Sequence, residues 1–154
     1  MYRPLNRPIS YRLLTLATAG VAVIALQLAF NTPGRAETVK FKADLKGSSE
    51  VPPNQSAGSG SVTASYDTAS KVLTWDGSYS GLSGPATAAH FHGPADAGKN
   101  AGVAVPIAPA SSPLHGTATL TDAQAADLMG GRWYVNVHTE ANKGGELRGQ
   151  LNKM

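Results

Sequence analysis

A strict alternation of apolar and polar residues, repeated in short runs, constrains this chain more than any other feature. Apolar side chains occupy every second position from Val39 to Leu45, with Lys and Asp between them. A period of two is typical of a β-strand with one buried and one solvated face, because successive side chains point to opposite faces of a sheet. Gly, Pro, Asn, Asp or Ser closes each further run, and the predicted strands cover residues 38–45, 62–66, 73–79, 86–92, 103–107, 114–120, 133–139 and 146–151.

One segment, residues 121–129, departs from this period and predicts a short helix. Thr121 and Gln124 have the spacing of a capping box, small and apolar residues fill the following turns, and a Gly-Gly pair supplies the stop. Seven or eight short strands with one short helix favour an all-β fold, either an antiparallel β-sandwich or a Greek-key barrel. The aromatic residues expected in its core are Trp75, Tyr79 and Trp133.

The first 36 residues have a different character, typical of a secretory signal peptide. Three arginines, Arg3, Arg7 and Arg12, precede an uncharged run of 18 residues from 13 to 30. A Pro-Gly break follows, with small residues at positions −3 and −1 of a cut after Ala36. The run is close to the roughly 17 residues that cross a bilayer, so a retained membrane anchor is the alternative. We favour cleavage, which predicts a signal peptide at 1–36, a mature domain at 37–154 and an exported protein, periplasmic or extracellular.

Charge is distributed unevenly along the chain. Four of the 13 Lys and Arg residues lie in the first 36 positions, which leaves nine against ten Asp and Glu in the mature part, a formal charge of −1. The leader contributes +4, so the positive net charge of +3 comes from the leader, and we expect no binding to nucleic acid. Membrane contact is expected only through a leader that is retained. The chain has no cysteine, so a packed core and not disulfides must stabilise it.

Two histidines stand two residues apart on a predicted strand. His90 and His92 share one face of that strand, and a rise of about 3.3 Å per residue puts their Cα atoms ~6.6 Å apart. His138 closes another predicted strand, on the same face as Tyr134 and Asn136. If the two strands are neighbours, three imidazoles can converge on one ion.

An all-imidazole set without thiolate points to Cu(II) or Zn(II), and we expect copper in preference to zinc. His115, at the start of a predicted strand, is a weaker fourth candidate. The alternative is that His90 and His92 are hydrogen-bonded strand residues near a sheet end and bind no metal. The spacing supports neither a Ser-His-Asp arrangement nor paired carboxylates, so no catalytic residue is assigned.

Polar residues near the histidines admit two interpretations. Glu140, Asn142 and Glu146 surround the loop after His138, where a carboxylate could orient an imidazole, but we favour a solvated turn. Glu50 precedes a rigid Val-Pro-Pro segment, and it either caps a loop over the sheet or lies in water.

Ordered blocks of sequence resemble the CHRD domain, a module named from chordin that also occurs as a stand-alone exported bacterial protein. These blocks run through nearly the whole mature chain. They are Phe41–Leu45, Glu50–Pro53, Gly58–Gly60, Leu73–Trp75, Tyr79–Gly84, Ala88–Ala95, Leu120–Thr121, Tyr134–Thr139 and Gly145–Leu151. The resemblance implies an exported domain but assigns no activity, because one fold hosts several functions.

The His-x-His strand and the later strand-end histidine are also distantly similar to copper-zinc superoxide dismutase, an exported Greek-key β-barrel. By this resemblance His90 and His92 correspond to its first pair of copper ligands and His138 to its late copper ligand. The chain lacks the cysteine pair and the bridging histidine with a zinc loop, and Arg148 is only a candidate for the anion-guiding arginine. The resemblance therefore implies a mononuclear copper site without zinc.

Three functions are consistent with these residues. We favour binding, storage or protection, with a metal ion held by His90, His92 and His138. The second is a copper-dependent enzyme similar to superoxide dismutase, whose activity His92→Ala would abolish. The third is a metal-free extracellular module that binds a protein partner, in which the histidines only order loops.

Overall fold

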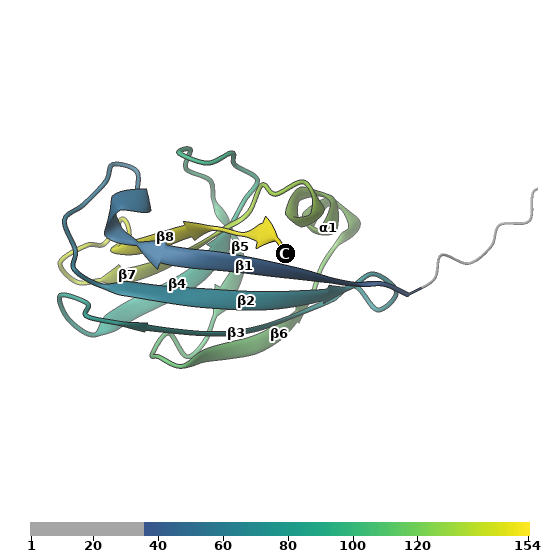
Figure 1. The fold of residues 1–154 in the computed structure, drawn as a ribbon, viewed down its shortest axis with the longest axis horizontal. Helices are drawn as coiled ribbons and strands as arrows, with labels where there is room; N and C mark the ends of the chain where they lie inside the picture. The colour runs from purple at the N-terminus through teal and green to yellow at the C-terminus, as the bar shows by residue number, and fades with distance from the viewer. Residues whose placement is uncertain (1–35) are drawn as a thin grey trace, which may run out of the picture. The chain divides into compact units, whose positions relative to one another are not determined.

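Residues 36–154 are described by a computed structural model, so the predicted signal peptide lies outside the described residues apart from Ala36. They form an antiparallel sheet and two short helical segments (Figure 1). The strands are β1 (Thr38–Lys46), β2 (Ser59–Asp67), β3 (Val72–Ser80), β4 (Ala86–His92), β5 (Val103–Ile107), β6 (Leu114–Thr119), β7 (Tyr134–Thr139), β8 (Leu147–Gln150) and β9 (Asn152–Lys153). The helical segments are the 3-10 turn η1 (Gly47–Ser49) and the α-helix α1 (Asp122–Met129).

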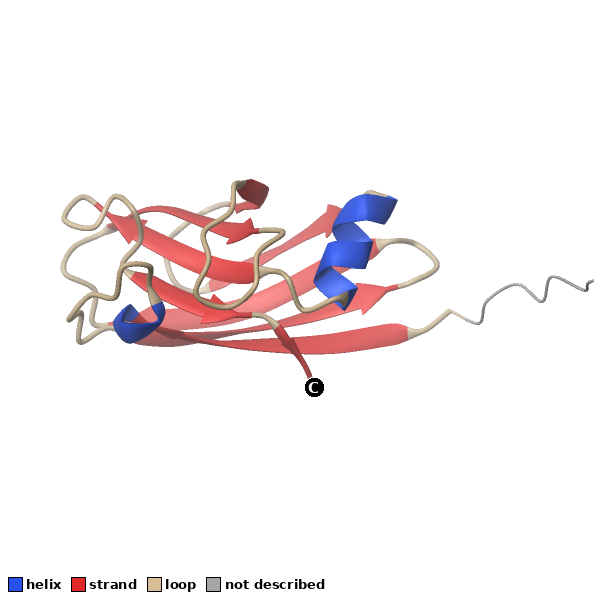
Figure 2. Ribbon diagram, turned by 90° about the horizontal axis from the view of Figure 1, so that it is seen from above, coloured by secondary structure: helices blue, strands red, loops and turns tan. Residues whose placement is uncertain are grey.

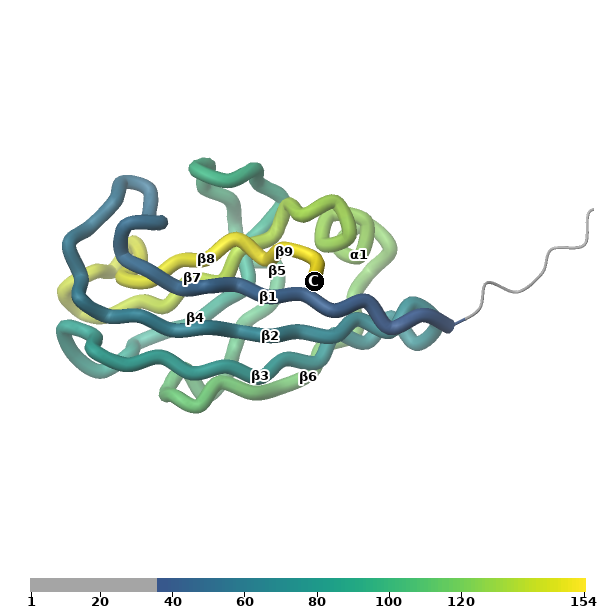
Figure 3. Tube along the Cα trace, in the orientation of Figure 1, coloured from purple at the N-terminus to yellow at the C-terminus, as the bar shows by residue number. Residues whose placement is uncertain are grey.

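The sheet is curved, so that its two edge strands lie near each other. The strand order is β5-β4-β7-β8-β1-β2-β3-β6, and β9 also pairs with β1. β5 and β6 end this order yet contact each other, which nearly closes the sheet into a barrel. β3 lies beside β6 and β4 beside β7, so the connections cross over as in a Greek key. The predicted all-β, antiparallel fold is confirmed, and Figure 3 shows the C-terminal strands lying beside β1.

Inward-facing residues of the strands fill the barrel, as the alternation predicts. In β1, every second residue from Phe41 onward is buried. The ring of Phe91 lies with its centroid 5.1 Å from that of Trp75 and 6.0 Å from that of Trp133. The predicted core position of both tryptophans is therefore confirmed. Tyr79 is only partly buried, and its hydroxyl donates a hydrogen bond to a loop carbonyl at 2.7 Å.

The helix begins with the predicted capping box. Thr121 Oγ1 accepts a hydrogen bond from Gln124 N at 3.2 Å, and Gln124 Oε1 accepts one from Thr121 N at 2.9 Å. Gly131, with a φ of +72°, follows the end of the helix, and Leu128 packs into the core with no exposed surface. In residues 36–154, α1 is the longer of the two helical segments (Figure 2), and neither has the length and apolar character of a membrane span.

The last predicted strand, residues 146–151, is divided in two. β8 pairs with β7, the buried Leu151 follows, and β9 then pairs with β1. The alternation does not predict β9, because Asn152 and Lys153 are both polar and exposed.

β7 is buried on both faces, and this burial positions the candidate site. Its inward-facing valines are fully buried in the core. On the outer face, Tyr134 and Asn136 are each only 3% exposed, because loops cover them. The hydroxyl of Tyr134 accepts a hydrogen bond from Ala101 N at 3.1 Å, and Asn136 Nδ2 donates one to Glu50 Oε1 at 2.7 Å.

Candidate metal site

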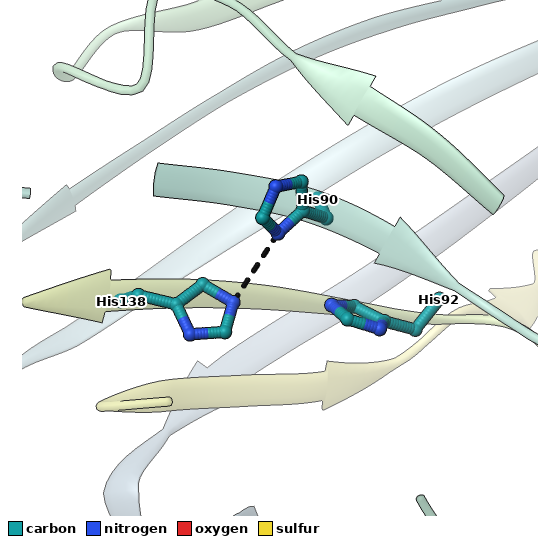
Figure 4. Close-up of side chains that lie close together, drawn as sticks. All are labelled: His90, His92 and His138. Carbon is teal, nitrogen blue, oxygen red and sulfur yellow. Dashed lines mark hydrogen bonds between the residues drawn. The ribbon is translucent and has the colours of Figure 1, made fainter. Parts of the chain in front are cut away.

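Three histidines come together on the outer face of the neighbouring strands β4 and β7 (Figure 4). His90 and His92 lie on β4, where the residues that alternate with them face the core. In the antiparallel register, His138 lies opposite Ala88 and His92 lies opposite Tyr134. His138 is therefore diagonal to His90 across the strand pair. The two strands are neighbours, which was the condition for a three-histidine cluster.

The three rings converge from their two strands. His90 Nδ1 and His138 Nε2 are 3.3 Å apart. Ring centroids lie 5.4 Å apart for His90 and His92, 5.2 Å for His90 and His138, and 6.0 Å for His92 and His138. One ring nitrogen from each histidine lies within 4.8 Å of the other two, and all three residues are half-buried. The geometry thus gathers one donor atom from each ring on the outer face of the two strands.

Backbone carbonyls orient two of the rings. His92 Nδ1 lies 3.0 Å from the Ala101 carbonyl, and His138 Nδ1 lies 3.0 Å from the Lys143 carbonyl. Because a carbonyl can only accept, each Nδ1 carries the proton and donates. In the neutral rings the lone pair is then on Nε2, the atom that a metal would take. His92 Nε2 is buried without a hydrogen-bond partner.

His90 presents its other ring nitrogen. Its Nδ1 faces His138 Nε2, which accepts, so His90 Nδ1 carries the proton of this hydrogen bond in the metal-free site. A metal ion held by the same three residues would take His90 through Nδ1 and the other two through Nε2. Loading the site therefore requires His90 to release its Nδ1 proton or move it to Nε2.

The surroundings favour neutral imidazoles. Burial, followed by the proximity of His138 and His92, lowers the pKa of His90 below its ordinary value of 6.5. Burial also lowers the pKa of His92, and this effect exceeds the opposing contribution of its hydrogen bond to Ala101. Both rings are therefore in the form that can bind a metal at neutral pH.

The spacing of the rings nearly matches a first-row metal. Bonds of about 2.0 to 2.1 Å to each nitrogen require donor atoms roughly 3 to 4 Å apart. The ring nitrogens of His90 and His138, 3.3 Å apart, meet this requirement. The nitrogens of all three residues lie within 4.8 Å of one another, so the His92 ring would have to move slightly toward the other two to bind the same ion. The spacing of the three residues fits a metal ion, and three protein ligands would leave one position of a four-coordinate ion unfilled.

Comparison with known proteins identifies the family of the chain. The model of the CHRD domain matches residues 41–151. The chain belongs to the CHRD domain family. CHRD domains are typically extracellular. No curated protein and no solved structure matched the chain.

Two other candidate residues of this CHRD domain are not members of the three-histidine cluster. His115 is exposed on β6 opposite Asp76 of β3, outside the cluster. Arg148 is only 2% exposed, and its Cζ lies 3.5 Å from the centroid of the Tyr134 ring. Since β8 and β4 flank β7 on opposite sides, Tyr134 separates Arg148 from His92. Arg148 is therefore placed to hold loops and not to guide anions from the surface.

The solvated turn that we favoured for the loop after His138 is wrong for Glu146. This carboxylate is fully buried, and it accepts hydrogen bonds from Ser56 Oγ at 2.7 Å, Ser83 Oγ at 2.6 Å and Thr139 Oγ1 at 2.6 Å. Burial favours the neutral acid, but these hydrogen bonds together outweigh it and lower the pKa of Glu146 to about 2. The carboxylate thus ties three segments together.

Only the outermost carboxylate of this loop matches the solvated turn. Glu140 is exposed and forms an ion pair of 2.8 Å with Lys143. Asn142 donates to Glu146 at 3.1 Å and so belongs to the buried network. The loop does orient the His138 ring, but through the Lys143 carbonyl and not through a carboxylate. A backbone acceptor carries no signature of residue type, so the sequence could not identify it.

Glu50 caps a loop over the sheet, the first of its two predicted roles. It is 5% exposed and accepts the hydrogen bond of Asn136, which is itself paired with His90 across the strands. Burial raises the pKa of Glu50 to about 7, although the charge of Arg148 and the hydrogen bond from Asn136 act in the opposite direction. The Glu50 carboxylate therefore contacts β7 through Asn136, the residue that lies opposite His90 in the register.

Proposed function

We propose that this CHRD domain binds a transition metal ion, copper in preference to zinc, through His90, His92 and His138. The observation that carries the proposal is the convergence of three imidazoles whose ring nitrogens lie within 4.8 Å of one another. Two of these rings are held by backbone carbonyls in the tautomer that leaves Nε2 unprotonated. We infer a role in binding, storage or protection.

The donor set supports copper. The cluster contains no thiolate and no carboxylate, and neutral imidazole suits Cu(II) and Zn(II). At a given site with nitrogen donors, Cu(II) binds more tightly than Zn(II). A domain family that is typically extracellular also meets copper in an oxidising compartment.

We further propose that the protein is exported to the periplasm or the extracellular space and that its leader is removed after Ala36. The arginine-rich start, the apolar run and the small residues before the cut support this proposal. Mass spectrometry of the secreted protein would give a chain that starts at Glu37. A chain that keeps residues 1–36 and sediments with membranes would instead favour a retained anchor.

A second candidate function is redox catalysis at the same metal. The observation that favours it is the half-exposed position of the three rings, which leaves room for an exogenous ligand. It predicts superoxide disproportionation that depends on added copper and disappears in His92→Ala. Copper binding without this activity would exclude superoxide disproportionation and favour storage or protection.

Calorimetric titration tests the proposal. We expect one Cu(II) per chain, with Zn(II) bound more weakly, and no stoichiometric binding in the His90→Ala/His92→Ala double variant. His115→Ala is the matched control, because it removes an exposed histidine outside the cluster and leaves binding unchanged. Failure of the wild-type protein to bind either ion would overturn the proposal and favour a metal-free interaction module.

A further inference from the structure

Three planar side chains are layered beside the histidine cluster. The rings of His92 and Tyr134 are stacked, with centroids 4.9 Å apart and planes 5° from parallel. The guanidinium of Arg148 covers the Tyr134 ring at 3.5 Å, from the side of β8. The order of the layers is thus His92, Tyr134, Arg148.

Each of the three side chains forms hydrogen bonds with the same short segment, residues 99–101. His92 Nδ1 donates to the Ala101 carbonyl at 3.0 Å. The Tyr134 hydroxyl accepts from Ala101 N at 3.1 Å and donates to Ala101 O at 3.3 Å. Arg148 Nη1 donates to Asn100 Oδ1 at 2.8 Å, and Nη2 donates to the Lys99 carbonyl at 2.5 Å.

The hydrogen bonds to residues 99–101 have a consequence for His92. The Ala101 carbonyl fixes the proton of His92 on Nδ1 only if the loop keeps that carbonyl beside the ring. Residues 99–101 are mostly exposed, so few buried contacts hold them in place. The hydrogen bonds from Tyr134 and Arg148 add to that restraint, beside the one that Asn100 Nδ2 donates to the Val51 carbonyl at 3.1 Å. The stacked Tyr134 ring also limits rotation of the imidazole about χ2.

We propose that Tyr134 and Arg148 are positioning residues, which hold His92 in the tautomer and orientation of a metal ligand through the backbone of Lys99–Ala101. The inference rests on the proposed metal-binding function. Tyr134 separates Arg148 from the imidazole. The Tyr134 hydroxyl is bonded to Ala101 and not to His92 Nε2, which has no hydrogen-bond partner. Metal binding at His92 would in turn strengthen its Nδ1–H donor and so tighten the loop.

Two variants separate the parts of this arrangement. Tyr134→Phe keeps the stacked ring and removes both hydrogen bonds to Ala101, whereas Arg148→Lys keeps the charge and removes the planar fork. Loss of a group that orients a metal ligand costs about 10- to 100-fold in affinity. We expect a loss in this range for each variant in competition titrations with Cu(II), together with altered EPR parameters of the bound Cu(II). Tyr66→Phe, on β2 and away from the stack, is the matched control.

A metal-free readout keeps this inference separate from the proposed function. The ¹⁵N shifts of the His92 ring in the protein without metal should show the Nδ1–H tautomer in wild type, and a mixture of both tautomers in Tyr134→Phe. Absence of copper binding by the wild-type protein would overturn the metal function, while the ring shifts would still decide whether Tyr134 positions His92. Folded variants with wild-type ring shifts, and with copper affinity within twofold of wild type where copper binds, would overturn the inference.

Discussion

The imidazoles of His90 and His138 meet at 3.3 Å, although 48 residues separate them in the chain. The register that joins β4 to β7 makes this contact, because it sets His138 opposite Ala88, two residues from His90. Each ring is half-buried, so neither is needed to fill the core. The contact is therefore one that substitution can remove without dismantling the fold.

We predict that His138→Ala lowers the affinity for Cu(II) by at least about 100-fold, since one of three ligands is lost and even an outer partner is worth 10- to 100-fold. The unfolding free energy should change by less than about 1 kcal/mol, because the side chain is half-exposed. Competition with a chelator measures the first quantity and urea denaturation the second. An equal loss of affinity in His115→Ala would show that binding at surface histidines is nonspecific.

The buried carboxylate of Glu146 makes stability depend on acid. Its pKa in the folded protein is about 2, against an ordinary value of 4.5. A lowered pKa contributes stability that is fully present above pH 4.5 and is lost as the pH falls toward 2. Glu146→Gln should remove this dependence and lower the unfolding free energy at pH 7 by on the order of 2 kcal/mol, because hydroxyl donors lose their charged acceptor.

Denaturation with urea at several pH values measures this effect. Glu140→Gln is the control, because Glu140 is exposed and its substitution should change stability by less than about 0.5 kcal/mol. A Glu146→Gln variant with the acid sensitivity of wild type would contradict the assignment.

Glu50 should have the opposite pH dependence. Its pKa is raised by burial from 4.5 to about 7, so the folded protein holds a proton that the unfolded chain releases. Its contribution to stability therefore declines as the pH rises from 4.5 to about 7. We expect Glu50→Gln, which keeps an oxygen to accept from Asn136, to gain stability relative to wild type as the pH rises from 4.5 to about 7. The midpoint of a carboxyl ¹³C titration near pH 4.5 would contradict this prediction.

Substitution of Gly145 tests how tightly Asn136 and Glu50 are packed. Its φ is +135°, and a Cβ there would lie 2.5 Å from Asn136 Nδ2 and 2.6 Å from Glu50 Oε1. Gly145→Ala should cost roughly 2 to 3 kcal/mol through backbone strain and overpacking. Gly144→Ala is the adjacent control, since a Cβ at that position meets no atom within 4 Å. Equal melting temperatures for the two variants would contradict the packing at Asn136.

The alternation of side chains predicts much of this domain. It places the strands, puts His90 and His92 on one face, and puts Tyr134, Asn136 and His138 on one face of another strand. The capping box likewise predicts α1, since its hydrogen bonds join residues three apart. Such features depend on neighbours in sequence, which a single chain displays directly.

Contacts between distant segments could not be predicted in the same way. Strand order decides that β4 and β7 are neighbours, and no local pattern encodes it. The network around Glu146 needs hydroxyls from Ser56 and Ser83, 90 and 63 residues away. The residues around Glu146 in sequence therefore predicted a solvated turn, although its carboxylate is buried.

Titration of the purified protein with Cu(II), followed by EPR, decides whether the three histidines bind copper. We expect one equivalent of bound Cu(II), with nitrogen hyperfine splitting from imidazole ligands that is absent in His90→Ala/His92→Ala. No bound Cu(II) in the wild-type protein, or the same spectrum in the double variant, would contradict it.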